Sequence, residues 1–530
     1  MRHLFSALFI FVAVSGCKPD QPTSAIPVAT SKAVAIDVVE LDAASIQHKL
    51  ESGAFTSRQL TQAYLDRIAQ IDKAGPSLNS IIEINTRALA EADELDVERK
   101  AGKIRGPLHG IPILLKDNID TVGMINSAGS LAMADNHPEK DAFLVTLLRS
   151  AGAIILAKTN LSEWANFRST RSSSGWSSRG GQTKNPYVLD RNPCGSSSGT
   201  ATAIAASLGT IGVGTETDGS IICPAAVSGL VGLKPTPGLV SRNGIIPISI
   251  SQDTAGPMGR TVSDVAILLN AMVGMDENDP EGHASAGNVP VDYRSFLKPD
   301  ALKGKRFGLL RQAMGYHPDV DAVTERAVAS LKAAGAEVIE IKIDTYDKWG
   351  SDEFEILLYE FKDGLNHYLK TATTANKSLE SLIAWNKAHA DKAMPYFGQE
   401  IFEQAQAKGP LTDPAYIKAK NDARRLAGKD GLLSTLDAKN LDALIAPSVS
   451  PAWPTDHVLG DHFIGSGYGI AAVAGTPSIT VPAGDSQGLP VGIVFMGRAY
   501  SEPELLGYAF AFEQISPARK APEYKPGITR

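Results

Sequence analysis

Hydrophobic and polar positions follow two periods along the chain, and each period predicts a different element. Leu60, Tyr64 and Ile68 recur at helical spacing directly after a capping-box sequence that begins at Thr56, which predicts a surface helix with one apolar face. Further helices are predicted from residue 198 onward, over 262–272 and over 322–331. Short apolar runs predict buried strands, at 154–157, 211–215, 307–310, 338–343, 444–446, 479–481 and 491–496. Strands that alternate with helices indicate a layered α/β protein.

Several regions carry neither period. Residues 169–181, rich in Ser, Arg and Gly, predict a flexible surface loop, residues 251–258 predict a turn, and residues 276–300 predict a connector. Residues 349–433 are helical, charged and aromatic, with no spacing typical of a reactive site. We interpret this last region as a helical cover or insertion.

The first residues have the pattern of an export signal. Leu4 to Val14 form an apolar run that is too short to cross a bilayer but fits the core of a signal peptide. The run ends at Val14-Ser15-Gly16-Cys17, which resembles a bacterial lipobox, and an ordinary secretory signal with a chance cysteine is the alternative. We expect 1–17 to be a lipoprotein signal peptide and lipobox with Cys17 lipidated, and 18–35 to be a flexible tether. The protein is then an extracytoplasmic lipoprotein on the periplasmic side, with the lipid as its membrane anchor.

Composition narrows the class of protein. Of 530 residues, 43% are hydrophobic and 21% are charged, which is ordinary for a soluble globular protein with a large core. The formal net charge is −7, so the broad basic surface that nucleic-acid binding requires is absent. The sequence has no H-E-x-x-H and no paired C-x-x-C, so we expect no metal and no cofactor.

Two turns rich in hydroxyls and glycine mark the candidate site, one at 195–199 and one at 217–220. A tight helix and strand separate them, so serines and free backbone N–H groups can meet there, as acyl-transfer chemistry requires. Lys116 ends another apolar run, which predicts a buried strand. A strand-end lysine usually reaches solvent, but a desolvated one can be neutral and act as a base.

Two other nucleophile patterns occur. Residues 195–199 satisfy G-x-S-x-G with Ser197 as nucleophile, but no buried strand precedes them, and His457 or His462 would have to serve as the base. Ser295 to Lys298 match S-x-x-K, but no K-T-G or S-D-N follows. We treat this second match as chance.

Taken together, NPCGSSSG, TETDGSI, VGLKPT and the lysine in GPLHGIPILLKDN resemble the amidase signature family of serine hydrolases, and most closely its bacterial peptide amidase branch. The resemblance covers residues 36–521, which we expect to form the amidase domain, with 522–530 as a C-terminal tail. It implies the family's fold, a large mixed β-sheet covered by helices on both faces.

The resemblance also assigns roles. Ser220 is the implied nucleophile, and Lys116 is the implied base of a Ser-Ser-Lys triad. Ser196 is the implied bridging serine, and the resemblance places it after a cis peptide bond. The implied oxyanion hole consists of the backbone N–H groups of Thr217, Asp218, Gly219 and Ser220, with Ser197 in support. Many members carry Gly at the position of Asp218, and the resemblance gives its carboxylate no role.

The implied function is hydrolysis of linear carboxamides, C-terminal peptide amides among them, to carboxylate and ammonia through a Ser220 acyl-enzyme. The alternatives are a glutaminase-type amidotransferase A subunit, or else a catalytically silent binding lipoprotein. No obligate protein partner is implied. Cys194 and Cys223 flank the two turns, and we expect them to be reduced and buried, with a disulfide as the alternative.

Overall fold

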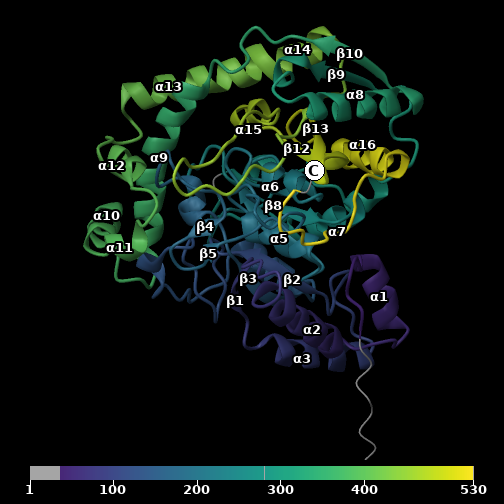
Figure 1. Ribbon diagram of the computed structural model, residues 1–530, viewed down its shortest axis with the longest axis vertical. Helices are drawn as coiled ribbons and strands as arrows, with labels where there is room; N and C mark the ends of the chain where they lie inside the picture. The colour runs from purple at the N-terminus through teal and green to yellow at the C-terminus, as the bar shows by residue number, and fades with distance from the viewer. Residues whose placement is uncertain (1–35, 280, 529–530) are drawn as a thin grey trace, which may run out of the picture. The chain divides into compact units, whose positions relative to one another are not determined.

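A computed structural model describes residues 36–279 and 281–528. The signal peptide, lipobox and tether predicted for residues 1–35 lie outside the described residues. From Ile36 onward the chain is one compact unit, built on an 11-stranded sheet (Figure 1). The strands are β1 (Ile81–Ile84), β2 (Pro112–Lys116), β3 (Ile154–Thr159), β6 (Ile211–Glu216), β7 (Val231–Lys234), β8 (Thr254–Gly259), β9 (Arg306–Leu310), β10 (Glu337–Ile341), β11 (Ala443–Pro447), β12 (Ser478–Ser486) and β13 (Leu489–Met496).

The sheet is mixed, in the order β1-β3-β2-β6-β8-β7-β12-β13-β11-β9-β10. Strands β3, β2 and β6 are parallel neighbours, as are β11, β9 and β10, and antiparallel pairs join these two groups through β8, β7, β12 and β13. A two-stranded sheet, β4 (Trp176–Ser177) with β5 (Gly181–Gln182), lies apart from it. The parallel order brings the ends of β2 and β6 side by side, and both ends carry candidate site residues.

Helices cover both faces of the sheet, as expected. They are α1 (Ala43–Glu51), α2 (Ser57–Arg67), α3 (Ala88–Lys100), α4 (Phe143–Ser150), α5 (Ser198–Ala205), α6 (Ile222–Val227), α7 (Val262–Met272), α8 (Pro318–Ala333), α9 (Gly350–Thr371), α10 (Leu379–Ala388), α11 (Ala390–Ala393), α12 (Glu400–Gln406), α13 (Pro414–Arg424), α14 (Ser434–Ala438), α15 (Gly469–Ala474) and α16 (Glu502–Ile515). The capping box predicted at Thr56 starts α2, and α7 has the predicted bounds.

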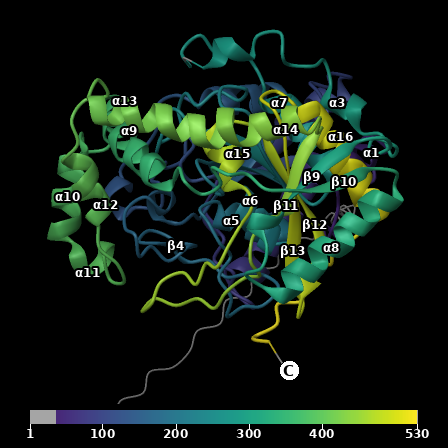
Figure 2. The ribbon, with the colours of Figure 1, turned by 90° about the horizontal axis from the view of Figure 1, so that it is seen from above.

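Alternating side chains of the strands divide the core in two, since successive residues of a strand face opposite sides of a sheet. Ile493 and Phe495 of β13 join a core with α7, α8 and α16, whereas Val494 and Met496 join a second core with α6, α9, α13 and α15. A third cluster joins α9, α10 and α12 to Trp164 and Phe167. The region 349–433 is thus helical, as expected, and Figures 1 and 2 show its green helices to one side of the strands.

Two local predictions are wrong. Residues 254–259 form the central strand β8 rather than part of a turn, and residues 169–181 are mostly buried or half-buried rather than a flexible surface loop. Gly256 suggested a turn, but a Cβ there would collide with the carbonyl oxygen of Leu233 on β7, so glycine permits close strand packing. Ser174 is held by Asp461, which accepts hydrogen bonds from its backbone N–H and its hydroxyl.

Near the end of the chain, the backbone of Lys525 pairs with Tyr187 and Leu189, so the described part of the segment predicted as a tail is attached to the core. Within the described ranges, no helix has the length and apolarity needed to span a membrane.

Candidate active site

Lys116 ends β2 and is completely buried. Its Nζ lies within hydrogen-bond distance of Ser196 Oγ at 2.7 Å, Thr215 Oγ1 at 2.8 Å and the Thr215 carbonyl at 3.1 Å. Burial lowers the pKa of Lys116 to about 7, against the opposing effect of the carboxylates of Asp253 and Glu216. The strand end therefore presents an amine whose neutral and protonated forms are both populated near pH 7, paired with a serine hydroxyl.

Ser196 and Ser197 lie just before α5 and have different surroundings. Ser196 follows a cis peptide bond from Gly195, as the family resemblance implied, and its hydroxyl is hydrogen-bonded to the Lys116 amine. Ser197 is fully buried, and its hydroxyl donates to the Thr215 carbonyl and accepts from the Thr215 N–H. Ser197 therefore ties the first turn to β6, which fits a supporting residue better than a nucleophile.

Ser220 ends the loop between β6 and α6 and is 8% exposed. Its carbonyl accepts a hydrogen bond from the Ser197 N–H at 3.1 Å, which joins the two turns. Within the part of the chain that the structure describes, the Ser220 hydroxyl takes part in no hydrogen bond, whereas the Ser196 hydroxyl does. The structure thus brings Lys116 and Ser196 into direct contact and places Ser220 on the adjacent loop.

The loop from Thr217 to Ser220 is held on both sides by carboxylates. Thr217 Oγ1 donates to Asp253 at 2.5 Å, and Asp253 also accepts from the N–H groups of Ile248 and Ser249. Glu216 accepts from the N–H groups that begin α6, at 2.6 and 2.9 Å. Burial raises the pKa of Asp253 to about 6. Both carboxylates therefore fix the backbone of the loop that the family resemblance assigns to the oxyanion hole.

Tyr468, just before α15, closes one side of this loop. Gly219 has a φ of 80°, a conformation that favours glycine, and a Cβ there would overlap the Tyr468 ring. Tyr468, Asp253 and Thr215 were not predicted as site residues from the sequence. Asp253 stood in a segment interpreted as a turn, and no local pattern connects Tyr468 with a loop so far away in the sequence.

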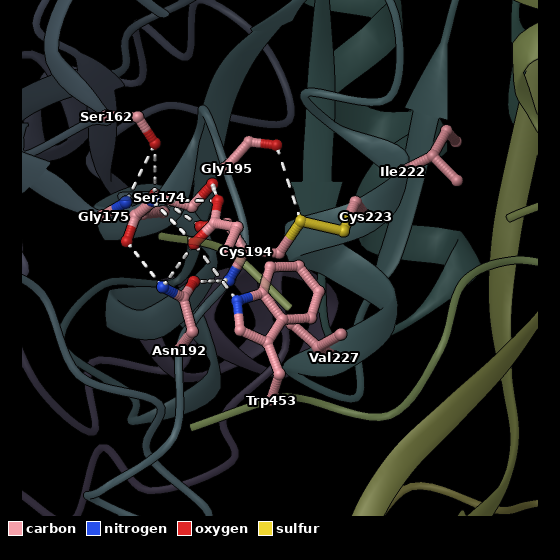
Figure 3. The surroundings of a disulfide bond; sticks show 12 residues. Ser162, Ser174, Gly175, Asn192, Cys194, Gly195, Ile222, Cys223, Val227 and Trp453 are labelled. Atoms are coloured by element: carbon pink, nitrogen blue, oxygen red, sulfur yellow. Dashed lines mark hydrogen bonds between the residues drawn. A yellow bond between two sulfur atoms is a disulfide. The ribbon is translucent and has the colours of Figure 1, made fainter. Parts of the chain in front are cut away.

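Cys194 and Cys223 form a disulfide, so the expectation of two reduced cysteines is wrong. Their Cα atoms lie 6.0 Å apart because the two turns meet, and a separation of that size permits the bond. Cys194 is two residues before Ser196, and Cys223 is three residues after Ser220. Figure 3 shows the bond beside Trp453 and Asn192, whose side-chain oxygen accepts from the Cys194 N–H. The disulfide therefore joins the two turns covalently.

Among the described residues, neither histidine named for the alternative with Ser197 as nucleophile is hydrogen-bonded to Ser197. His457 stacks on Tyr396, and His462 pairs with Asp456. No group of metal-binding side chains occurs within the described ranges.

Comparison with known proteins agrees with this geometry, since the Amidase family model matches residues 59–506. The chain belongs to the amidase family. It is 39% identical to a probable amidase of Arabidopsis thaliana over 483 residues, 88% of each chain. It is 35% identical to the A subunit of the glutamyl-tRNA(Gln) amidotransferase of Thermosynechococcus vestitus, covering 87% of this chain and 95% of that one.

Solved structures give a closer likeness. The peptide amidase PAM in complex with the competitive inhibitor chymostatin is 52% identical, with a TM-score of 0.90 over 92% of this chain and 99% of that one. The native peptide amidase of Stenotrophomonas maltophilia is 51% identical, with a TM-score of 0.88 over the same shares. The predicted amidase signature fold is confirmed, and the protein is an amidohydrolase by family.

Proposed function

We propose that this amidase cleaves primary carboxamides, C-terminal peptide amides among them, to a carboxylate and ammonia. The observation that carries the proposal is the buried pair of Lys116 and Ser196, 2.7 Å apart, in a chain 52% identical to a peptide amidase. A neutral amine bonded to a serine hydroxyl can accept a proton without a histidine.

The proposed reaction begins at Ser220. Its hydroxyl turns toward Ser196 as substrate binds and passes a proton through the Ser196 hydroxyl to neutral Lys116. The Ser220 oxygen bonds to the amide carbon, and the carbonyl electrons move to oxygen, where the N–H groups of Thr217 to Ser220 stabilise the charge. Each good donor of this kind contributes about 3 kcal/mol. The sequence of steps needs no metal and no cofactor.

Collapse of the tetrahedral intermediate breaks the carbon–nitrogen bond. The Lys116 ammonium returns its proton through Ser196 to the departing nitrogen, which leaves as ammonia. Water then attacks the Ser220 ester and gives its proton to the same relay, which releases the carboxylate and restores Ser220. Burial suits Lys116 to both steps, since a pKa of about 7 lets the amine accept and return a proton near neutral pH.

A panel of amides, assayed by ammonia release and mass spectrometry, tests the proposal. An acetylated peptide amide should become the free acid without fragmentation. The same peptide with a free C-terminal carboxylate contains the same internal peptide bonds and should stay intact. Fragments from internal cleavage, or no ammonia from any peptide amide, would contradict it.

The glutaminase-type A subunit is the second candidate, because the chain is 35% identical to the A subunit of an amidotransferase. Free glutamine in the same panel separates the two, since that function requires ammonia from glutamine. The third alternative, a silent binding lipoprotein, predicts no turnover of any amide.

We also propose that the protein is exported and anchored to a membrane through a lipid on Cys17. The apolar run and lipobox-like residues before Cys17 support this, and so does the disulfide, because disulfides persist mainly outside the cytoplasm. Cys17→Ser should remove the acyl group from the mature N-terminus and shift the protein out of the membrane fraction. Unchanged fractionation together with an unacylated wild-type N-terminus would refute the anchor.

A further inference from the structure

Asp218 is the one residue from Asn192 to Thr236, a stretch that the structure describes throughout, that is exposed to solvent rather than buried. Its neighbours Thr217 and Ser220 are 7% and 8% exposed. Solvent therefore reaches the loop of the proposed nucleophile chiefly at the side chain of Asp218. A substrate that reaches the loop at this point meets the carboxyl group of Asp218.

The carboxyl group of Asp218 lies beside the start of α15. A Cβ built on Gly469 would stand 3.6 and 3.7 Å from its two oxygens, so the group is directed toward α15 and does not bond to Lys116. Among the described residues, Asp218 forms no hydrogen bond and no ion pair. Its hydrogen-bonding capacity is thus free for a ligand.

The charges around Asp218 are mostly negative. Although part of the Asp218 side chain reaches solvent, desolvation by the protein packed around its carboxyl group raises the pKa of Asp218 well above its usual value. Glu353 of α9, Glu216 and Asp347 act in the same direction, and Lys234 opposes them. Glu353 is 8% exposed, and only one of its oxygens is bonded, by the side-chain amide of Gln252 at 2.9 Å. A cation placed here would relieve the repulsion between these carboxylates.

We propose that Asp218, with Glu353 behind it, determines specificity by binding a positively charged group in the acyl part of the substrate. This inference rests on the proposed amide hydrolysis. The leaving nitrogen must face Ser196 and Lys116, which return its proton, whereas Asp218 faces α15. The group it meets therefore belongs to the acyl part, at the residue that carries the amide or the one before it.

The test compares lysine with norleucine, which has a similar chain without the ammonium. Acetyl-Lys-NH2 and acetyl-Nle-NH2 place the charge on the residue that carries the amide, and acetyl-Lys-Leu-NH2 and acetyl-Nle-Leu-NH2 place it one residue earlier. Ammonia release at low ionic strength gives kcat/KM for each. We expect the wild type to prefer lysine by about tenfold or more in at least one pair, with the preference falling as salt rises.

The ratio of lysine to norleucine within each variant is the readout, so a general loss of activity cancels. Asp218→Asn should bring the ratio close to one, Glu353→Gln should lower it in part, and Asp352→Asn, the neighbouring acid on α9, should leave it as in the wild type. Asp218→Gly is the second variant if Asp218→Asn does not fold.

Three outcomes separate the possibilities. A wild type that cleaves both members of each pair equally overturns the inference and leaves amide hydrolysis standing, as does a lysine preference that survives in both variants of Asp218. A protein that releases ammonia from none of the four amides contradicts the proposed function itself.

Discussion

Replacing Lys116 by methionine should remove activity and, at neutral pH, stabilise the fold. Methionine fills similar volume without an ionisable group, so it removes the proposed base and the cost of burying an amine. Turnover should fall on the order of 10⁴-fold, as in other coupled catalytic units. The gain in stability is the more demanding expectation, since most substitutions of buried residues destabilise.

The magnitude follows from the pKa of Lys116, about 7 in the fold against a usual value of 10.5. Between these values the unfolded chain binds a proton that the folded chain does not, so the free energy of unfolding rises with pH by about 1.4 kcal/mol per unit. This stability is fully present above the pKa of Lys116 in the unfolded chain and is lost as pH falls toward its pKa in the folded chain. At pH 7 the loss amounts to about 4 kcal/mol.

Methionine avoids that cost but forfeits the three hydrogen bonds of Nζ, worth about 1 kcal/mol each. Lys116→Met should therefore be about 1 kcal/mol more stable than the wild type at pH 7 and about 1 kcal/mol less stable at pH 9. The change of about 2 kcal/mol between the two pH values does not depend on the hydrogen bonds.

Urea unfolding at pH 7, 8 and 9, followed by circular dichroism, measures this difference, with exposed Lys342→Met as the control that should parallel the wild type. Parallel curves for Lys116→Met and the wild type would show that the Lys116 amine keeps its usual pKa. The neutral-lysine mechanism would then fail as well. If the mechanism holds, wild-type kcat/KM should rise with pH through about 7, because the neutral fraction of Lys116 rises with it.

Three further predictions address the loops. Ser220→Ala should lower turnover on the order of 10⁴-fold, and no acyl-enzyme should then form. If Ser197→Ala were inactive while Ser220→Ala stayed active, Ser197 rather than Ser220 would be the nucleophile. Replacing both Cys194 and Cys223 by alanine should lower the free energy of unfolding by about 3–4 kcal/mol, the loop-closure value for a separation of 29 residues, and an unchanged urea midpoint would contradict this. Asp253→Ala should lower kcat about 10²-fold with little change in KM, because it frees Thr217 of the oxyanion loop, and a change in KM alone would count against that role.

The local pattern of hydrophobic and polar residues predicted the helices and strands well, because their formation depends largely on residues close together in the sequence. The apolar run before Lys116 and the helix over 262–272 are where the sequence placed them. The order of the strands was not predictable, since β12 pairs with β7 in the sheet although these two strands are far apart in the sequence. Residues 251–258 were predicted as a turn, but Gly256 and Pro257 lie in β8, where glycine permits the close approach of β7.

The site shows the same division. The long motifs placed Lys116 and Ser196, and the structure puts the two side chains in contact. The groups that hold the loop came from elsewhere, such as Asp253, which holds Thr217 across 36 residues, and no short motif encodes that contact. The disulfide was likewise undetermined, because cysteine spacing in the sequence does not show that the two turns meet.

The contact between Tyr468 and Gly219 limits how the enzyme can be redesigned. Any side chain at 219 would meet both the aromatic ring and an unsuitable φ, while Thr217 is committed to Asp253 and Ser220 to the proposed chemistry. Position 218 is the exposed position of this loop and its side chain forms no hydrogen bond among the described residues, so it has the most freedom to change. Laboratory evolution toward new amides should therefore accumulate changes at 218 and in the opposing α9 and α15, and should leave 219 untouched unless Tyr468 changes with it.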